Sequence, residues 1–288
     1  MVTQAHKLRS LLSLDECHIM PCCYDGLSAK MIEQAGFPFT FMSGFAVSAA
    51  RLGLPDTGLI SYGEMVDQGR NICGSVSIPV LGDGDTGYGN ALNVRRTVDG
   101  YSRAGFAAVM IEDQVSPKRC GHTRGKLIVS RDEACERIKA AVDARQEGQD
   151  ILIIGRTDAR AGHGLDEAME RVRIFSELGA DILFVEAPES VEEMEIICRE
   201  VDGIHMANII DGGKTPVLSP SELHSVGFRI AAYPLTLISA AMQAMTIALK
   251  DLQAGNTPRG LMSFKDVRKI VGFDDYYNAE KRYGTFRR

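Results

Sequence analysis

The segment from Glu112 to His122 concentrates residue types that could carry out chemistry. It follows an apolar run, starts with Glu112, and ends in Lys-Arg-Cys-Gly-His at positions 118–122. Cationic neighbours favour the thiolate of Cys120, and a cysteine in such a place can transfer a proton or attack carbon. The alternative is a solvated loop whose cysteine packs as a small apolar side chain. We predict that Cys120 is catalytic and that His122 assists it.

A second acidic group lies earlier in the chain. Asp83 and Asp85 follow a short apolar run, and in extended backbone their side chains would point the same way and meet Glu112 of the next strand. Neighbouring carboxylates need a cation, and without a histidine in the group Mg²⁺, or Mn²⁺, fits better than Zn²⁺. An Asp-Gly-Asp turn on the surface is the alternative. The glycines at 84, 87 and 89 either admit a ligand or serve the turn.

Polar residues also follow the other predicted strands. They are Tyr24 with Asp25, Ser43 with Gly44, Arg156 with Asp158, Glu186, Asn208, and Tyr233 with Pro234. We expect Asp25 to cap a helix. Arg156 forms either a structural ion pair or a fork for a substrate carboxylate, and Asn208 and Ser43-Gly44 suit carboxylate or enolate oxygens. Together these groups predict carbanion or enolate chemistry on a small dicarboxylate.

The elements that must position these residues alternate between short apolar runs and longer helical segments. Strands are predicted at 18–23, 39–42, 79–82, 107–111, 151–155, 182–185, 204–207 and 228–232, and helices at 7–14, 26–35, 62–73, 91–104, 131–145, 165–178, 191–200, 221–226, 237–253, 263–271 and 274–283. Residues 52–58 are expected to be irregular. Runs without alternation indicate strands buried on both faces. The pattern predicts a (β/α)₈ barrel, with an open doubly wound sheet as the alternative. In such a barrel the active site lies at the carboxyl ends of the strands.

Composition limits the classes of protein to which the chain can belong. Of its 288 residues 45% are hydrophobic and 24% are charged, so it can bury a full core. A net charge of -6 without a basic block argues against a nucleic-acid partner. There is no apolar run long enough for a membrane span and no signal peptide, so no membrane partner is expected. Seven cysteines without a Cys-x-x-Cys pair favour reduced thiols and a cytoplasmic location.

These motifs jointly resemble the isocitrate lyase/phosphoenolpyruvate mutase superfamily over essentially the whole chain. The matching segments are 52–56, 83–89, 112–114, 118–122, 156–159, and Asn208 with 212–216. The resemblance implies one barrel domain over residues 1–288, with a C-terminal helical extension from about 255. It also implies Mg²⁺ near Asp83, with Asp56, Asp85 and Glu112 acting partly through water, and a mobile loop over 115–126. The implied assembly is a homotetramer whose C-terminal helices are exchanged between subunits.

The cysteine of the Lys-Arg-Cys-Gly-His run is similar to the lyase branch, which cleaves a C–C bond of a di- or tricarboxylate 2-hydroxy acid. That branch implies that Cys120 protonates the leaving aci-carboxylate, that Arg156 grips a carboxylate, and that Tyr24 or a carboxylate near the metal is the base. The residues that would bind substrate are Ser43, Gly44, Gly121, His122, Arg156, Glu186, Asn208, Thr215, Pro234 and Leu235.

Two segments bear on the subclass. Residues 208–216 resemble 2,3-dimethylmalate lyases and carboxyphosphonoenolpyruvate mutases more than 2-methylisocitrate lyases, which places binding of a third carboxylate in question. Pro234 resembles the lyases, whereas oxaloacetate hydrolases carry serine there. The expectation is a lyase for a 2-alkylmalate or 2-methylisocitrate-type acid, yielding pyruvate and a succinate-like or propionate-like acid. The alternatives are a phosphonomutase, an oxaloacetate hydrolase and a non-catalytic barrel.

Overall fold

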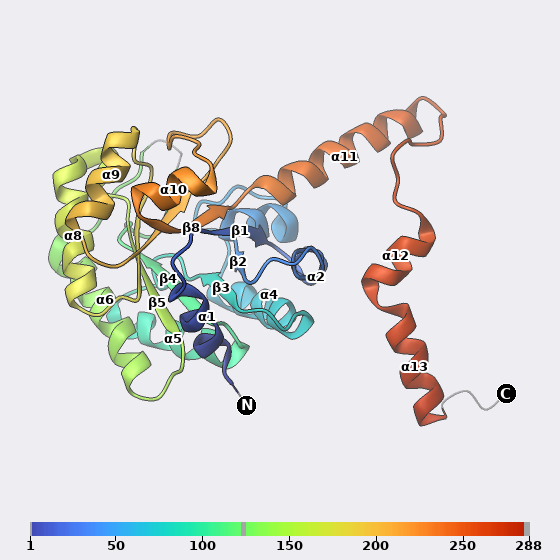
Figure 1. Cartoon of the computed structure of the whole chain (residues 1–288), viewed down its shortest axis with the longest axis horizontal. Helices are drawn as coiled ribbons and strands as arrows, with labels where there is room; N and C mark the ends of the chain where they lie inside the picture. The colour runs from blue at the N-terminus through green and yellow to red at the C-terminus, as the bar shows by residue number, and fades with distance from the viewer. Residues whose placement is uncertain (1, 122–124, 285–288) are drawn as a thin grey trace. The chain divides into compact units, whose positions relative to one another are not determined.

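Eight parallel strands close into a single barrel in the computed structural model, which describes residues 2–121 and 125–284 (Figure 1). The strands of this described part are β1 (His18–Cys23), β2 (Thr40–Met42), β3 (Val80–Asp83), β4 (Ala108–Glu112), β5 (Leu152–Thr157), β6 (Ile182–Val185), β7 (Ile204–Asn208) and β8 (Phe228–Tyr233). Each strand pairs with its sequence neighbour, and β1 also pairs with β8, with His18 opposite Ile230. This closing pair confirms the predicted (β/α)₈ barrel and excludes the open sheet.

In the described part of the chain, helices lie between consecutive strands, before β1 and after β8. They are α1 (Gln4–Leu12), α2 (Gly26–Gln34), α3 (Gly44–Val47), η1 (Ser48–Leu52), α4 (Tyr62–Ser75), α5 (Ala91–Ala104), α6 (Arg131–Gln146), α7 (Arg160–His163), α8 (Leu165–Glu177), α9 (Val191–Glu200), α10 (Pro220–Val226), α11 (Thr236–Gln253), α12 (Phe264–Val271) and α13 (Phe273–Tyr283). Asp25 caps α2 as predicted: its side chain accepts a hydrogen bond from the Ser28 amide, and the two residues form a capping box.

The core has two layers, and the strands alternate between them. On β4, Ala108 and Met110 belong to the cluster inside the barrel, whereas Val109 and Ile111 belong to the cluster between barrel and helices. The period of two follows from strand geometry. Ala5, Leu8 and Leu12 of α1 join the interior cluster, so this helix buries its apolar face against the same side chains.

The structure corrects the predicted elements in two ways. Residues 44–52 form α3 and the π-helical turn η1. No helix was predicted there, and Leu52 was expected to begin an irregular segment. A side chain of Ser43 caps this segment by accepting a hydrogen bond from the Ala46 amide. Several strands also run further than expected, so that Asp83, Glu112 and Arg156 lie within β3, β4 and β5. These side chains are therefore held by ladder-bonded backbone rather than by loops.

The described contacts divide the chain into two compact units, Met1–Ile238 and Ser239–Arg288. The first contains the barrel, and the second contains most of α11 together with α12 and α13. The prediction of one domain with an extension from about 255 stays a prediction. No helix in the described part of the chain has both the length and the apolar character that a membrane crossing requires.

Candidate active site

The candidate site residues continue the inward-facing series of the strands. On β4 the interior residues Ala108 and Met110 lead to Glu112, and on β5 Leu152 and Ile154 lead to Arg156. The same step of two leads from Phe184 to Glu186, from Met206 to Asn208 and from Ala232 to Pro234. Because side chains alternate along a strand, each of these residues is directed toward the barrel axis at its carboxyl end.

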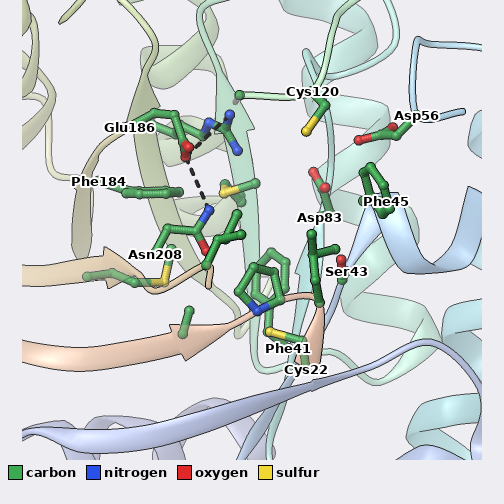
Figure 2. A pocket seen from close by; sticks show the side chains of 18 of the residues that line it. Cys22, Phe41, Ser43, Phe45, Asp56, Asp83, Cys120, Phe184, Glu186 and Asn208 are labelled. Carbon is green, nitrogen blue, oxygen red and sulfur yellow. Dashed lines mark hydrogen bonds and ion pairs between the residues drawn. The ribbon is translucent and has the colours of Figure 1, made fainter. Parts of the chain in front are cut away.

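One pocket lies among these strand ends, and two groups of polar side chains face each other across it. Figure 2 shows Ser43, Asp56 and Asp83 on one side and Glu186 with Asn208 on the other. The predicted site residues among its lining are Ser43, Asp56, Asp83, Cys120, Gly121, Arg156, Glu186, Asn208, Pro234 and Leu235. The apolar part of the lining comes from Cys22, Phe41, Phe45, Met110, Phe184, Met206, Ile210 and Ala232.

A lysine lies within the acidic side of the site. The Lys118 ammonium Nζ is 2.7 Å from Asp56 Oδ2 and 2.8 Å from Asp85 Oδ1, and all three side chains are buried. Burial would lower the pKa of Lys118, but the carboxylates of Asp85, Asp83 and Asp56 outweigh burial and raise it well above its usual value. Lys118 therefore remains a cation and neutralises part of the cluster.

The second aspartate differs from its predicted conformation. Asp85 has a φ of 49°, in the left-handed region, and its amide donates to Asp83 Oδ1 at 3.0 Å. The expected extended backbone from Asp83 to Asp85 was therefore wrong. The turn is possible because Gly84 lies against the Met110 carbonyl, where an added Cβ would be 2.5 Å from that oxygen. Burial raises the pKa of Asp85 to about 6, although Lys118 opposes this shift.

The donor set of this cluster suits a hard divalent cation. Asp56 Oδ1 and Glu112 Oε1 are buried without a hydrogen-bond partner among the described residues, and carboxylate oxygens are the ligands that Mg²⁺ prefers. Burial raises the pKa of Glu112 well above its usual value. In the part of the chain that the structure describes, no three acidic, histidine or cysteine side chains converge as ligands of one ion. The carboxylates of this cluster fit Mg²⁺, and the Lys118 ammonium lies beside two of them, Asp56 and Asp85.

Arg156 is held by three carboxylates at the opposite side of the pocket. Its Nε lies 2.8 Å from Asp158 Oδ2 and 3.2 Å from Glu112 Oε2, and its Nη2 lies 3.5 Å from Glu186 Oε2. Burial alone would raise the pKa of Asp158, but Arg156 and Lys126 lower it below its usual value. The guanidinium is thus fixed in orientation and stays charged.

The loop that carries Cys120 passes close to Arg156 and its three carboxylates, which we call the clamp, and a glycine lies at the point of closest approach. A Cβ added to Gly121 would lie 2.5 Å from Arg156 Nη2 and 2.6 Å from Glu186 Cδ. No larger residue fits there without moving the clamp, so Gly121 allows Cys120 to line the pocket. His122, predicted beside Cys120, lies outside the described residues, as does part of the loop predicted to be mobile.

Several predicted residues do not line the pocket. Asp85 and Glu112 lie behind the lining in the charged clusters, and the Gly44 amide donates to Asp83 Oδ2 at 3.2 Å. Thr215 is buried, and Tyr24 lies beside the outer core cluster. Burial raises the pKa of Tyr24. The glycines after Asp83 serve the turn, because Gly87 and Gly89 have positive φ values of 83° and 149°.

Two lysines of the site were missed from the sequence, and Asp158 was named there only as a polar residue at a strand end. Lys118 was seen only as part of a motif, although it bonds Asp56, which is 62 positions away. Asp158 orients Arg156, and Lys126 donates to Asp158 Oδ1 at 2.7 Å. The neighbouring Arg-Thr-Asp sequence hinted at the role of Asp158, but Lys126 carried no signal because its partner lies in another loop.

Comparisons with known proteins agree with this architecture. The family model described as phosphoenolpyruvate phosphomutase matches residues 8–253. The 2,3-dimethylmalate lyase of Eubacterium barkeri is 42% identical over 98% of this chain and 99% of its own length. A solved structure of 2,3-dimethylmalate lyase, described as a PEP mutase/isocitrate lyase superfamily member, has a TM-score of 0.94 at 37% identity, covering 99% of this chain and 96% of that one.

An oxaloacetate acetylhydrolase in complex with the inhibitor 3,3-difluorooxalacetate also has a similar structure. Its TM-score is 0.95 at 33% identity, and the alignment covers 98% of both chains. The family match and these identities extend over the barrel and its carboxyl-end loops. The chain is therefore an enzyme of the phosphoenolpyruvate mutase/isocitrate lyase superfamily.

Proposed function

We propose that the enzyme is a Mg²⁺-dependent carbon–carbon lyase for 2-hydroxy acids of the 2-alkylmalate or 2-methylisocitrate type. The products would be a 2-oxo acid such as pyruvate and a succinate-like or propionate-like acid. The observation that carries the proposal is that Cys120 lines one pocket together with Arg156, Asp83 and Asn208. In the proposed reaction Cys120 would be the proton donor, Arg156 the fork for a carboxylate and Asp83 a metal ligand, all around one small volume.

In the proposed reaction a base removes the proton of the 2-hydroxyl group, and the adjacent C–C bond breaks as that carbon becomes a carbonyl. The electron pair of the bond leaves with the acid fragment, and the Cys120 thiol donates its proton to the carbon that receives the pair. The proton taken by the base balances the proton that the thiol gives up. We favour a carboxylate of the acidic cluster over Tyr24 as the base, because burial raises the pKa of Tyr24.

Asp83 would hold the metal, with Asp56, Asp85 and Glu112 contributing partly through water. When bound, Mg²⁺ would supply positive charge to the oxygens of the forming 2-oxo acid. Arg156 would bind a substrate carboxylate, because its fork is already oriented by Asp158. Asn208 and Ser43 would donate hydrogen bonds to the remaining carboxylate and carbonyl oxygens.

The pocket chemistry favours a dicarboxylate with alkyl groups. Lys118 and Arg156 are the cations among the described lining residues, and both already contact carboxylates of the protein. The rest of the wall includes Phe184, Met206 and Ile210, which suit methyl or ethyl substituents better than a third carboxylate. Alkylmalates are therefore the first substrates to test.

The deciding experiment is metal-dependent release of pyruvate, coupled to a dehydrogenase, from 2,3-dimethylmalate, other alkylmalates, 2-methylisocitrate and oxaloacetate. Turnover of one alkylated hydroxy acid that EDTA abolishes would support the lyase. Cys120→Ser should then lose turnover while it keeps metal and pyruvate binding. Full turnover in this variant would refute the proton-donor role, and no turnover of any hydroxy acid would refute the lyase.

Oxaloacetate hydrolysis is the second candidate, because an oxaloacetate acetylhydrolase has so similar a structure. Pro234 lines the pocket and has no hydroxyl group with which to bind a hydrated ketone. Oxalate formation from oxaloacetate, measured directly beside the pyruvate assay, would favour this candidate. A phosphonomutase would instead convert a phosphonate substrate and leave the whole panel of acids unchanged.

We further propose a homotetramer that uses the C-terminal unit, with helices exchanged between subunits. Large apolar side chains of this unit are exposed, among them Leu249, Leu252 and Phe264 at 65%, 59% and 77%. Exposed apolar surface of this extent is typical of an interface. The cytoplasmic location stays a prediction.

A further inference from the structure

A buried ionic network lies directly behind the clamp that holds Arg156. Asp113 follows Glu112 and faces outward, opposite to the pocket, because side chains alternate at the end of β4. Its Oδ2 accepts hydrogen bonds from Thr157 Oγ1 at 2.6 Å and from Arg171 Nη1 at 3.1 Å, and its Oδ1 accepts from the Asp158 amide at 2.9 Å. Asp113 therefore joins the end of β4 to the end of β5.

Two arginines from the surrounding helices complete the network. Arg171 of α8 also donates to the Val129 carbonyl at 3.0 Å, and Arg137 of α6 donates to the Glu112 and Gln114 carbonyls at 3.2 and 2.7 Å. Both arginine side chains are 4% exposed. Buried charges with this many partners are held in one geometry.

The network connects the two stems of the cysteine loop. The Val115 amide donates to the Leu127 carbonyl at 2.8 Å, and the Val129 amide donates to the Asp113 carbonyl at 2.9 Å. Arg171 bonds the returning stem at Val129 and the outgoing stem at Asp113. The same Asp113 fixes the backbone of Asp158, whose carboxylate orients Arg156.

We infer that Asp113 and Arg171 are positioning residues that align the Cys120 loop with Arg156. Neither residue lines the pocket, so they act through the Asp158 backbone and the loop stems. The catalytic roles of Cys120 and Arg156 rest on the proposed function, but the alignment itself does not. Arg171 is suited to this task because its planar fork bonds Asp113 and the Val129 carbonyl at once, which a lysine does not reproduce.

The test compares Arg171→Met and Arg171→Lys with a control arginine at the other end of the barrel. Arg145 of α6 donates to the Gly179 carbonyl at 3.1 Å and pairs with Asp181, which accepts from the Ile153 amide near the start of β5. Arg145→Met removes a partly buried ion pair between α6 and the residue before β6, away from the loop. The measurements are kcat and KM, the rate of Cys120 alkylation by iodoacetamide followed by peptide mass spectrometry, and Tm.

We expect Arg171→Met to lower kcat by about tenfold or more, since small displacements of catalytic groups have effects of this order. Cys120 alkylation should become several-fold faster as the loop stems separate, and Arg171→Lys should recover only part of both changes. Arg145→Met should lower Tm without changing kcat or alkylation. If Arg171→Met changes only Tm, as the control does, Arg171 is merely structural and the inference is wrong.

Asp113→Asn provides an independent variant if Arg171→Met folds poorly. It keeps the shape of the side chain but loses the charge that pairs with Arg171, so it should reproduce the faster alkylation. The double variant should not add to the single effects, because both remove one interaction. Additive effects would contradict a shared role. If the wild-type enzyme cleaves no tested acid, the proposed function fails, while alkylation still decides the alignment.

Discussion

Lys118 contacts two buried carboxylates of the acidic side of the site, those of Asp56 and Asp85. A buried carboxylate pair without a cation is costly, because each charge has lost its hydration. The ammonium of Lys118 and a divalent metal can therefore both offset the lost hydration of these carboxylates. This makes the cluster sensitive both to substitution of Lys118 and to metal.

Replacing Lys118 with Met should destabilise the protein. In EDTA at neutral pH we expect the free energy of unfolding to fall by about 3 kcal/mol, because Asp56 and Asp85 lose their buried partner. Added Mg²⁺ should restore part of the loss by binding to the folded state. Urea unfolding with EDTA and with Mg²⁺ measures both effects. The exposed Lys139→Met is the control, and an unchanged unfolding midpoint in Lys118→Met would contradict the assignment.

Gly121 has a steric role that can be tested with one methyl group. In Gly121→Ala the new Cβ would lie 2.5 Å from Arg156 Nη2, so the loop or the clamp must shift. We expect kcat/KM to fall by about tenfold or more with little change in Tm. Gly74→Ala in α4 is the control, since no atom lies within 4 Å of its added Cβ. Equal activity of both variants would show that the contact is unimportant.

At the scale of elements, the alternation of side chains along a strand directs one residue toward the barrel interior and the next toward the surrounding helices. Interior residues of β4 and β5 lead to Glu112 and Arg156, while the next outward positions hold Asp113 and Thr157. Arg156 lines the pocket and Glu112 lies behind its lining, whereas Thr157 donates to Asp113, which also accepts from Arg171 of α8. One residue of shift in either strand would exchange these two sets, so the closed ladder itself specifies the site.

A histidine in β7 makes a prediction about stability and pH. His205 is 2% exposed, and its Nε2 lies 2.6 Å from the Val201 carbonyl. Burial lowers the pKa of His205, so the unfolded chain takes up its proton first as the pH falls. The stabilising effect of the neutral ring is therefore complete above the unfolded pKa of about 6.5 and is lost as the pH falls below that value.

Urea unfolding at pH 7.5 and 5.5 measures this dependence. His205→Gln keeps a hydrogen-bond donor but cannot take up a proton in this pH range, so its stability should fall less between the two pH values than that of the wild-type protein. The exposed His163→Gln is the matched control. A reduced difference in both variants, or in neither, would contradict the assignment to His205.

At the scale of the whole molecule, the closed barrel and the C-terminal unit differ in how far they bury their apolar side chains. The barrel buries its apolar strands on both faces. The second unit has α12 and α13 without a buried residue in the described structure. Helices of this kind need a partner for their apolar side chains.

The assembly is tested by light scattering coupled to size-exclusion chromatography. We expect the wild-type protein to run as a tetramer and the double variant Leu249→Glu, Phe264→Glu to run as a smaller species, because charges would replace exposed apolar contacts. Lys250→Glu, also exposed on α11, is the control for added negative charge. A wild-type monomer would refute the proposed tetramer, and a double variant of unchanged mass would refute the role of this surface.

The sequence by itself determined the barrel and most of the polar residues that line the pocket. Apolar runs of four to six residues separated by helical segments are local patterns, and they located every strand to within a few residues. Polar residues at the strand ends, such as Arg156 and Asn208, could be identified because the barrel brings all carboxyl ends to one face. The periodicity of apolar residues and the order of the strands were sufficient to predict the barrel and its polar strand ends.

Only the tertiary structure decided which charges meet. Lys118 bonds Asp56 across 62 positions, and Arg171 bonds Asp113 across 58, and neither spacing follows a local period. The left-handed Asp85 depends on the close approach of Gly84 to Met110 on the next strand. Such contacts depend on where loops and helices pack after the barrel has closed. Local sequence patterns encode the direction of a side chain, whereas its partner is set by the packing of distant segments.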